Sequence, residues 1–175
     1  WFETLKSLNS NKLEIDLSID ATGDIQDYQR TGGEWSKIKK NIIKYKDTFR
    51  NVTIHLTASA INFPVLDKWW DELMSFEIDV FFGVVHWPIS MNLDAIPDEY
   101  KKYQIAWLNK WIEKKENPRS LHFRAVDEVK AILSTSKYNA HYNKEFKERI
   151  KELDNIRNEN ILDLDYRFED IMNEG

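Results

Sequence analysis

The chain has 175 residues, 42% of them hydrophobic and 13% aromatic, which supplies enough apolar surface for one folded domain with a core. Its net charge of -5 argues against a dedicated nucleic-acid or membrane-surface binder. The lack of cysteine excludes disulfides, zinc–thiolate sites and a cysteine-held iron–sulfur cluster within these residues. No apolar run approaches the roughly 20 residues of a membrane span. No signal-peptide pattern opens the chain, so we expect a cytoplasmic protein.

The first predicted element is a strand at 13–20, where apolar and polar side chains alternate. A glycine-marked loop follows it, and then an amphipathic stripe predicts a helix at 34–46. The same two patterns recur as a strand at 51–59, a helix at 65–75 and a strand at 77–86. Strands that alternate with helices in this way are typical of right-handed βαβ units and a parallel sheet.

The rest of the chain is predicted to be mostly helical, with helices at 98–115, 120–135 and 142–157 and an ambiguous tail. The predicted fold is therefore α/β, with three parallel strands and a helical C-terminal region. A parallel sheet covered by helices on both faces has continuously apolar strands, but the first two strands here are apolar on one side only. Their polar positions are Asp16, Ser18, Asp20, Thr53, His55, Thr57 and Ser59.

Two interpretations of this polar face remain open. Too few helices separate the strands to cover it, so the face is either the inner wall of a partial (β/α) barrel or a surface that solvent or a dimer partner covers. In a barrel, the polar groups would meet a ligand or water, because burying them unpaired is costly. Neither a G-x-G-x-x-G motif nor a P-loop is present, and His86, His122 and His141 show no metal-like spacing with one another.

The stretch "LSIDATGDIQDYQRTGGEW", residues 17–35, resembles the fourth-strand region of radical S-adenosylmethionine (SAM) enzymes of the SPASM or twitch type. That region ends a strand in S-[IL]-D-G and continues with Y-[IV]-R, a small loop and an aromatic residue. The matching residues are Ser18, Ile19, Asp20, Tyr28, Arg30 and Trp35. The strand "VTIHLTASAIN" resembles the fifth strand of the family, which closes with an Asn. The tail "LDNIRNENILDLDYRFEDI" resembles the L-D-x-x-R…D…F ending of twitch-type members.

The resemblance implies a partial (β/α)6 barrel with SAM at the carboxyl ends of the strands, where parallel α/β folds generally bind ligands. It places Ser18 and Asp20 near the ribose and the amino-acid part of SAM. It also pairs the guanidinium of Arg30 with the SAM carboxylate.

Three further SAM contacts follow from the resemblance: Asn62 as a polar contact, and Val84 and Val85 beside the adenine. The chain departs from the family in lacking the C-x3-C-x2-C loop and the G-G-E motif, and in having Ala21 where Gly is common. The expected 4Fe–4S cluster would therefore be held outside this chain.

We accordingly expect the C-terminal half of such an enzyme, not catalytically competent alone. Residues 1–90 would form half of the (β/α)6 barrel, with "WFETLKSL" as the end of its third helix. Residues 91–175 would form a helical extension packed on that half. The substrate would be a small molecule or a peptide, and the open sheet edge would favour a homodimer.

Two other functions are compatible with the sequence. The first is a cysteine-free α/β half-barrel that serves as a binding or scaffold module. The second is a hydrolase-like enzyme that uses Asp16, Asp20 and His55, three side chains on one face that no known motif assigns to roles.

Overall fold

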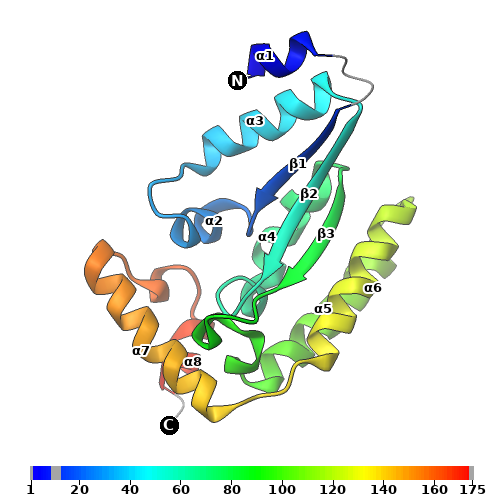
Figure 1. Cartoon of the computed structure of the whole chain (residues 1–175). Helices are drawn as coiled ribbons and strands as arrows, with labels where there is room; N and C mark the ends of the chain where they lie inside the picture. The colour runs from blue at the N-terminus through cyan, green and yellow to red at the C-terminus, as the bar shows by residue number, and fades with distance from the viewer. Residues whose placement is uncertain (1, 9–12, 174–175) are drawn as a thin grey trace.

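The computed structural model of the chain describes residues 2–8 and 13–173 and has an α/β fold (Figure 1). Three strands, β1 (Glu14–Ile19), β2 (Asn51–Ala58) and β3 (Asp79–Val84), form one parallel sheet in the order β1-β2-β3. The predicted strands and their parallel pairing are confirmed, although each strand is shorter than predicted.

The register of the sheet brings the polar positions of the strands to one face. Asp16 of β1 lies opposite Thr53 of β2, and Thr53 lies opposite Asp79 of β3. Ser18 likewise lies opposite His55. Because side chains alternate between faces along a strand, the matched register gives the sheet one polar and one apolar face.

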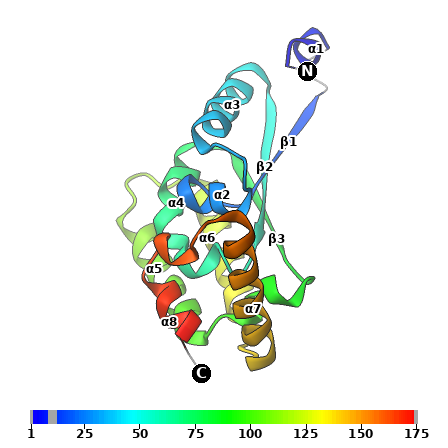
Figure 2. The ribbon, with the colours of Figure 1, turned by 90° about the vertical axis from the view of Figure 1, so that its left-hand side faces the viewer.

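Helices α2 (Gly23–Gln29), α3 (Trp35–Thr48) and α4 (Leu66–Ser75) lie on the apolar side of the sheet (Figure 2). Ile54, Leu56 and Val80 point into this layer and are at most 3% exposed. The amphipathic helix α4 contributes Trp69 and Trp70, which are also fully buried. Large aromatic rings bury more apolar area per residue than other side chains, so these two tryptophans contribute strongly to the hydrophobic stabilisation.

The short helix α2 corrects the prediction of a loop after the first strand. Gly23 adopts the left-handed region (φ +60°), which lets the chain turn from β1 directly into the helix. Ile25 and Tyr28, three residues apart, are both buried and anchor the helix to the core. Seven residues are too few for a clear helical period, so the pattern did not reveal this helix.

The C-terminal half is helical, as predicted. It contains α5 (Asp98–Lys114), α6 (Ser120–Thr135), α7 (Ala140–Arg157) and α8 (Arg167–Asn173), while the short helix α1 (Phe2–Ser7) precedes the sheet. The 3-10 turns are Phe63–Val65, Ile89–Met91, Leu93–Ala95 and Ile161–Asp163. Within the described ranges, no helix is long and apolar enough to cross a bilayer.

Helix α6 covers the outer edge of β3. The carboxylate of Glu128 accepts a hydrogen bond from the backbone N–H of Phe82 at 3.3 Å, and Arg124 forms an ion pair with Asp79. These contacts occupy polar groups that an edge strand would otherwise leave open to another strand. Strand β1 is the other edge of the sheet, and it has no strand on its outer side among residues 2–8 and 13–173.

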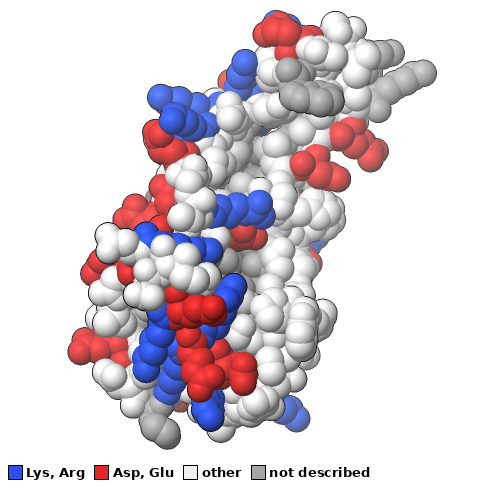
Figure 3. All heavy atoms as spheres, turned by 60° about the vertical axis from the view of Figure 1, so that its left-hand side comes forward, with Lys and Arg blue, Asp and Glu red and all other residues white. Residues whose placement is uncertain are grey.

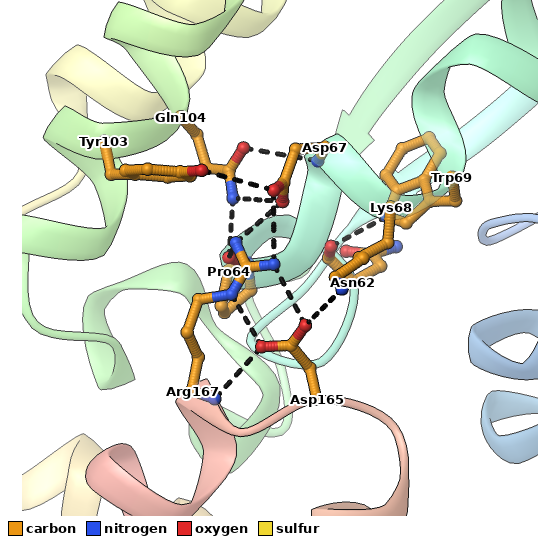
Figure 4. Close-up of polar contacts among 9 residues, drawn as sticks. All are labelled: Asn62, Pro64, Asp67, Lys68, Trp69, Tyr103, Gln104, Asp165 and Arg167. Carbon is orange, nitrogen blue, oxygen red and sulfur yellow. Dashed lines mark hydrogen bonds and ion pairs between the residues drawn. The ribbon is translucent and has the colours of Figure 1, made fainter.

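A buried polar network attaches α8 to the rest of the molecule (Figure 4). The guanidinium of Arg167 donates to Asp165 and to Asp67, both at 2.7 Å, and to the backbone carbonyl of Pro64 at 3.0 Å. Gln104 of α5 donates to the same carbonyl and to Asp67. This network links the tail, the start of α4 and α5, so the ambiguous tail is an integral part of the fold.

Candidate functional site

A cavity of about 360 Å³ lies where the carboxyl ends of the strands approach helix α7. Its volume is at the small end of the range for small-molecule sites, and its position is the one that parallel α/β folds use for ligands. The strand side contributes Asp20, Thr57, Ser59 and Val85. These four residues come from the ends of all three strands, and sequence analysis had assigned each of them to the site.

The carboxylate of Asp20, which precedes α2, is paired with Arg30 at the C-terminal end of that helix. Arg30 Nε donates to Asp20 Oδ2 at 2.7 Å, and its Nη2 donates to Ser18 Oγ at 3.3 Å. The hydrogen bond to Asp20 raises the pKa of Arg30 above its ordinary value. The Arg30 side chain is 48% exposed, so this pair contributes little to stability. Ser18 and Arg30 contact or adjoin Asp20 but do not themselves line the cavity.

Asn62 is placed differently from the role that the resemblance implied. It is fully buried, and its side-chain oxygen accepts from the backbone N–H of Ser59 at 2.8 Å. Its amide nitrogen donates to the carbonyls of Asp20 and Thr57, at 2.5 and 2.8 Å. Asn62 therefore connects the ends of β1 and β2. By this contact it fixes the position of Asp20, Thr57 and Ser59, which line the cavity.

Gln29, the residue between Tyr28 and Arg30, also lines the cavity. Its amide nitrogen donates to Ser59 Oγ at 3.1 Å, whereas its Oε1 is buried and has no hydrogen-bond partner among the described residues. A buried acceptor without a partner is unfavourable, so this oxygen is a local cost to stability at the cavity wall.

The opposite wall of the cavity belongs to α7, which contributes Arg149, Leu153 and Arg157. Two contacts hold this helix against α2: the Tyr28 hydroxyl donates to Asp154 Oδ1 at 2.7 Å, and Arg157 Nη1 donates to the Tyr28 carbonyl at 3.0 Å. Burial, followed by the hydrogen bond to Asp154, raises the pKa of Tyr28 well above its ordinary value. The tyrosine is thus held neutral as the hydrogen-bond donor that joins the two walls.

Basic and acidic side chains lie intermixed over the lower half of the face that Figure 3 presents, without a broad field of one sign. Around the cavity itself, the lining residues include the arginines of α7 and the single carboxylate of Asp20. Each of these arginines is also paired with a neighbouring carboxylate, Arg149 with Glu152 and Arg157 with Glu159.

The remaining polar positions of the sheet form a separate group farther along the strands. His55 Nε2 lies 3.6 Å from Asp16 Oδ1, the same oxygen that accepts a hydrogen bond from Thr53. The ring of His55 packs against Phe81 at 5.4 Å between centroids. These side chains share the polar face but do not line the cavity at the strand ends.

The two valines at the end of β3 have different surroundings. Val85 lines the cavity beside α7, whereas Val84 lines a smaller cavity of about 220 Å³ together with His86 and residues of α6. Among residues 2–8 and 13–173, no group of three or more His, Cys, Asp or Glu side chains has an arrangement that could hold a metal ion.

No family model matches this chain. Comparisons with curated proteins and with solved structures also found no match. Function must therefore be inferred from the geometry of the site and from the motifs in the sequence.

Sequence analysis did not assign Gln29, Arg149, Leu153 or Arg157 to the site. A signal for the last three was nevertheless present, because they are spaced four residues apart and so share one face of a predicted helix. Leu153 and Arg157 are also the first and last residues of the L-D-x-x-R motif in the tail.

Proposed function

We propose that this chain forms the C-terminal half of a radical SAM-type partial (β/α) barrel and contributes one wall of the SAM pocket. In this proposal the missing strands of the barrel would pair with the free edge of β1. The cluster and the rest of the SAM pocket would come from outside the chain, which would not be catalytically competent alone.

The observation that carries the proposal is the contact between the two motifs of the family resemblance. Tyr28 belongs to the Y-x-R motif and Asp154 to the L-D-x-x-R motif, 126 residues later, and they share a hydrogen bond of 2.7 Å. Arg157 of the second motif donates to the Tyr28 backbone. The two motifs are far apart in the sequence, yet they meet at the rim of one cavity. This contact favours a shared role of the two motifs in forming the cavity.

The polar groups in the cavity wall and directly beside it, where Ser18 and Arg30 contact Asp20, suit the polar half of SAM. Asp20 is an acceptor for ribose hydroxyls or for the ammonium group, and Ser18 is a hydroxyl partner beside it. Arg30 is bound through Nε and Nη2 to these residues, and its guanidinium retains donors for a carboxylate. Val85 gives an apolar contact for the adenine. A cysteine-free binding module could have the same fold, but its function would not require this combination of SAM-binding groups.

The test is an NMR titration of the 175-residue chain with SAM, followed through backbone amide shifts. We expect saturable shifts at Ser18, Asp20, Thr57 and Ser59. The variant Arg30→Ala should weaken the affinity roughly tenfold, because it removes a charge-assisted hydrogen bond to the carboxylate.

The matched control is Arg124→Ala. Arg124 also forms an ion pair with an Asp and is about as exposed as Arg30, but it lies on α6 beside Asp79. Its removal should leave the SAM affinity within about twofold of the wild type. Shifts that spread over the surface, or an equal loss of affinity in both variants, would refute the proposal.

A further inference from the structure

Helix α7 presents two arginines to the same cavity. Arg149 and Arg157 lie eight residues apart, on either side of Leu153, and all three side chains line the cavity wall opposite the strand ends. The spacing of four residues places them along one face of the helix. The result is a wall with two guanidinium groups separated by an apolar contact.

Both guanidinium groups have hydrogen-bonding capacity left. Arg149 contacts Glu152 through Nη1 at 2.6 Å, and Arg157 contacts the Tyr28 carbonyl through Nη1 at 3.0 Å. Within the described part of the chain these protein contacts involve only the Nη1 atoms, although a guanidinium carries five N–H donors. The geometry therefore leaves Nε and Nη2 of each arginine for another acceptor.

The position of the Arg157 donors is fixed by the fold, whereas Arg149 is 44% exposed and contacts Glu152 on its own helix. Arg157 is only 24% exposed, and its contact with the Tyr28 backbone holds it against α2. The Tyr28–Asp154 hydrogen bond holds the same turn of α7 in place. A donor that is already oriented loses less conformational entropy when it binds an anion, which makes this wall better suited to recognition than a flexible surface lysine.

We propose that Arg149 and Arg157 form an anion subsite that binds the carboxylate or phosphate group of a second ligand in this cavity. Arg30, on the strand side, lies beside Asp20 and Ser18 and is the partner proposed above for the SAM carboxylate. SAM has one carboxylate, so an additional pair of guanidiniums on the opposite wall favours a different anionic molecule. That this molecule is the co-substrate rests on the proposed function, whereas the anion subsite rests on the geometry alone.

The experiment titrates the 175-residue chain with pyrophosphate and, separately, with citrate, and follows backbone amide shifts by NMR. We expect saturable shifts at Arg149, Leu153 and Arg157 with at least one of the two anions, and the better binder identifies the preferred group. Arg149→Ala should weaken that affinity about tenfold, and Arg149→Lys should restore part of it, because charge is retained but the planar fork is lost.

The matched control is Lys151→Ala, which removes one positive charge from the same helix at an exposed position that does not line the cavity. Its affinity for the anion should stay within about twofold of wild type. If neither anion shifts the α7 amides, or if Lys151→Ala weakens binding as much as Arg149→Ala, the subsite is refuted.

A parallel titration with SAM separates the two proposals. SAM binding at the strand ends, combined with anion binding that does not depend on Arg149, would refute the subsite alone. Arg149-dependent anion binding with no SAM binding would support the subsite and refute the proposed function.

Discussion

At the scale of single residues, Tyr28 is the link between the two walls of the candidate site. Its ring is buried in the core, its hydroxyl binds Asp154 and its carbonyl binds Arg157. The tyrosine therefore combines hydrophobic anchoring of α2 with two polar contacts to α7. This is also the place where the two sequence motifs meet.

Tyr28→Phe should lower the free energy of unfolding by about 1–2 kcal/mol, because it removes a hydrogen bond to a partly buried carboxylate and keeps the ring. Urea denaturation measures this loss. The control is Tyr45→Phe on α3, because the Tyr45 ring packs on Phe49 while its hydroxyl makes no hydrogen bond within residues 2–8 and 13–173. A loss for Tyr28→Phe no larger than for the control would show that the contact does not hold the walls together.

Sequence reasoning located the site residues that lie on strands better than those on helices. Asp20, Thr57 and Ser59 were found because strand alternation fixes which face a side chain occupies. Asn62 was matched by motif, but the sequence does not indicate that its amide is already hydrogen-bonded to Ser59 and to the backbone carbonyls of Asp20 and Thr57. Arg149 is one of several charged residues on α7. Whether it lines the cavity depends on how α7 packs against the strand ends, which the sequence does not indicate.

At the scale of elements, α8 is held by a buried polar network in addition to the apolar side chains of Phe168 and Ile171, which are fully buried. Arg167 and Asp165 are 5% and 6% exposed, and each depends on the other for compensation of its charge. Breaking such a pair leaves an uncompensated buried charge, which costs more than the pair itself contributes.

Arg167→Ala should therefore destabilise the protein strongly, by roughly 3–5 kcal/mol. Arg124→Ala, which breaks a half-exposed ion pair with Asp79, should cost no more than about 1 kcal/mol. Thermal and urea denaturation of the two variants gives the comparison. Equal losses would show that the α8 network is not buried in solution.

The same network predicts an acid-dependent loss of stability. Burial alone would raise the pKa of Asp165, but the hydrogen bonds and charge of Arg167, with Lys68, outweigh burial and lower this pKa from 3.8 to about 2. A carboxylate whose pKa is lower in the folded state stabilises the fold above pH 3.8, and this contribution is lost as the pH falls toward 2. It corresponds to roughly 2 kcal/mol.

Denaturation curves between pH 5 and about pH 2 measure this effect. Asp165→Asn should flatten the dependence on pH in that interval, whereas Asp163→Asn, at an exposed position in the preceding turn, should leave its slope unchanged. An unchanged slope in Asp165→Asn would contradict the assignment.

At the scale of the whole molecule, the sheet has two unlike edges. Helix α6 covers the β3 edge through Glu128 and Arg124, while β1 has no neighbouring strand on its outer side within the described residues. In the proposed barrel, additional strands would therefore join at β1 only.

Hydrogen exchange tests the role of α6 at the β3 edge. The amide of Phe82 should exchange slowly in the wild type, because Glu128 accepts its hydrogen bond. In Glu128→Ala it should exchange faster, by about tenfold, whereas the amide of Leu56 inside the sheet should not change. Uniform acceleration of both amides would indicate global destabilisation and would contradict a local edge contact.

The order of secondary structure and the parallel sheet could be predicted because periodicity reports directly on strands and long helices. The packing of α7 across the strand ends could not, because contacts such as Tyr28–Asp154 join residues far apart in sequence and leave no local pattern. The motifs indicated both ends of that contact without indicating that they meet.

The most direct test of the account is the detection of intermolecular nuclear Overhauser effects between SAM and this chain. The account predicts effects between the adenine protons of SAM and the methyl groups of Val85, together with effects from the ribose protons to the loop after β1. Effects that instead connect SAM to the outer helices, for example to Trp107 and Trp111, would contradict the assignment of the strand-end cavity as the SAM pocket.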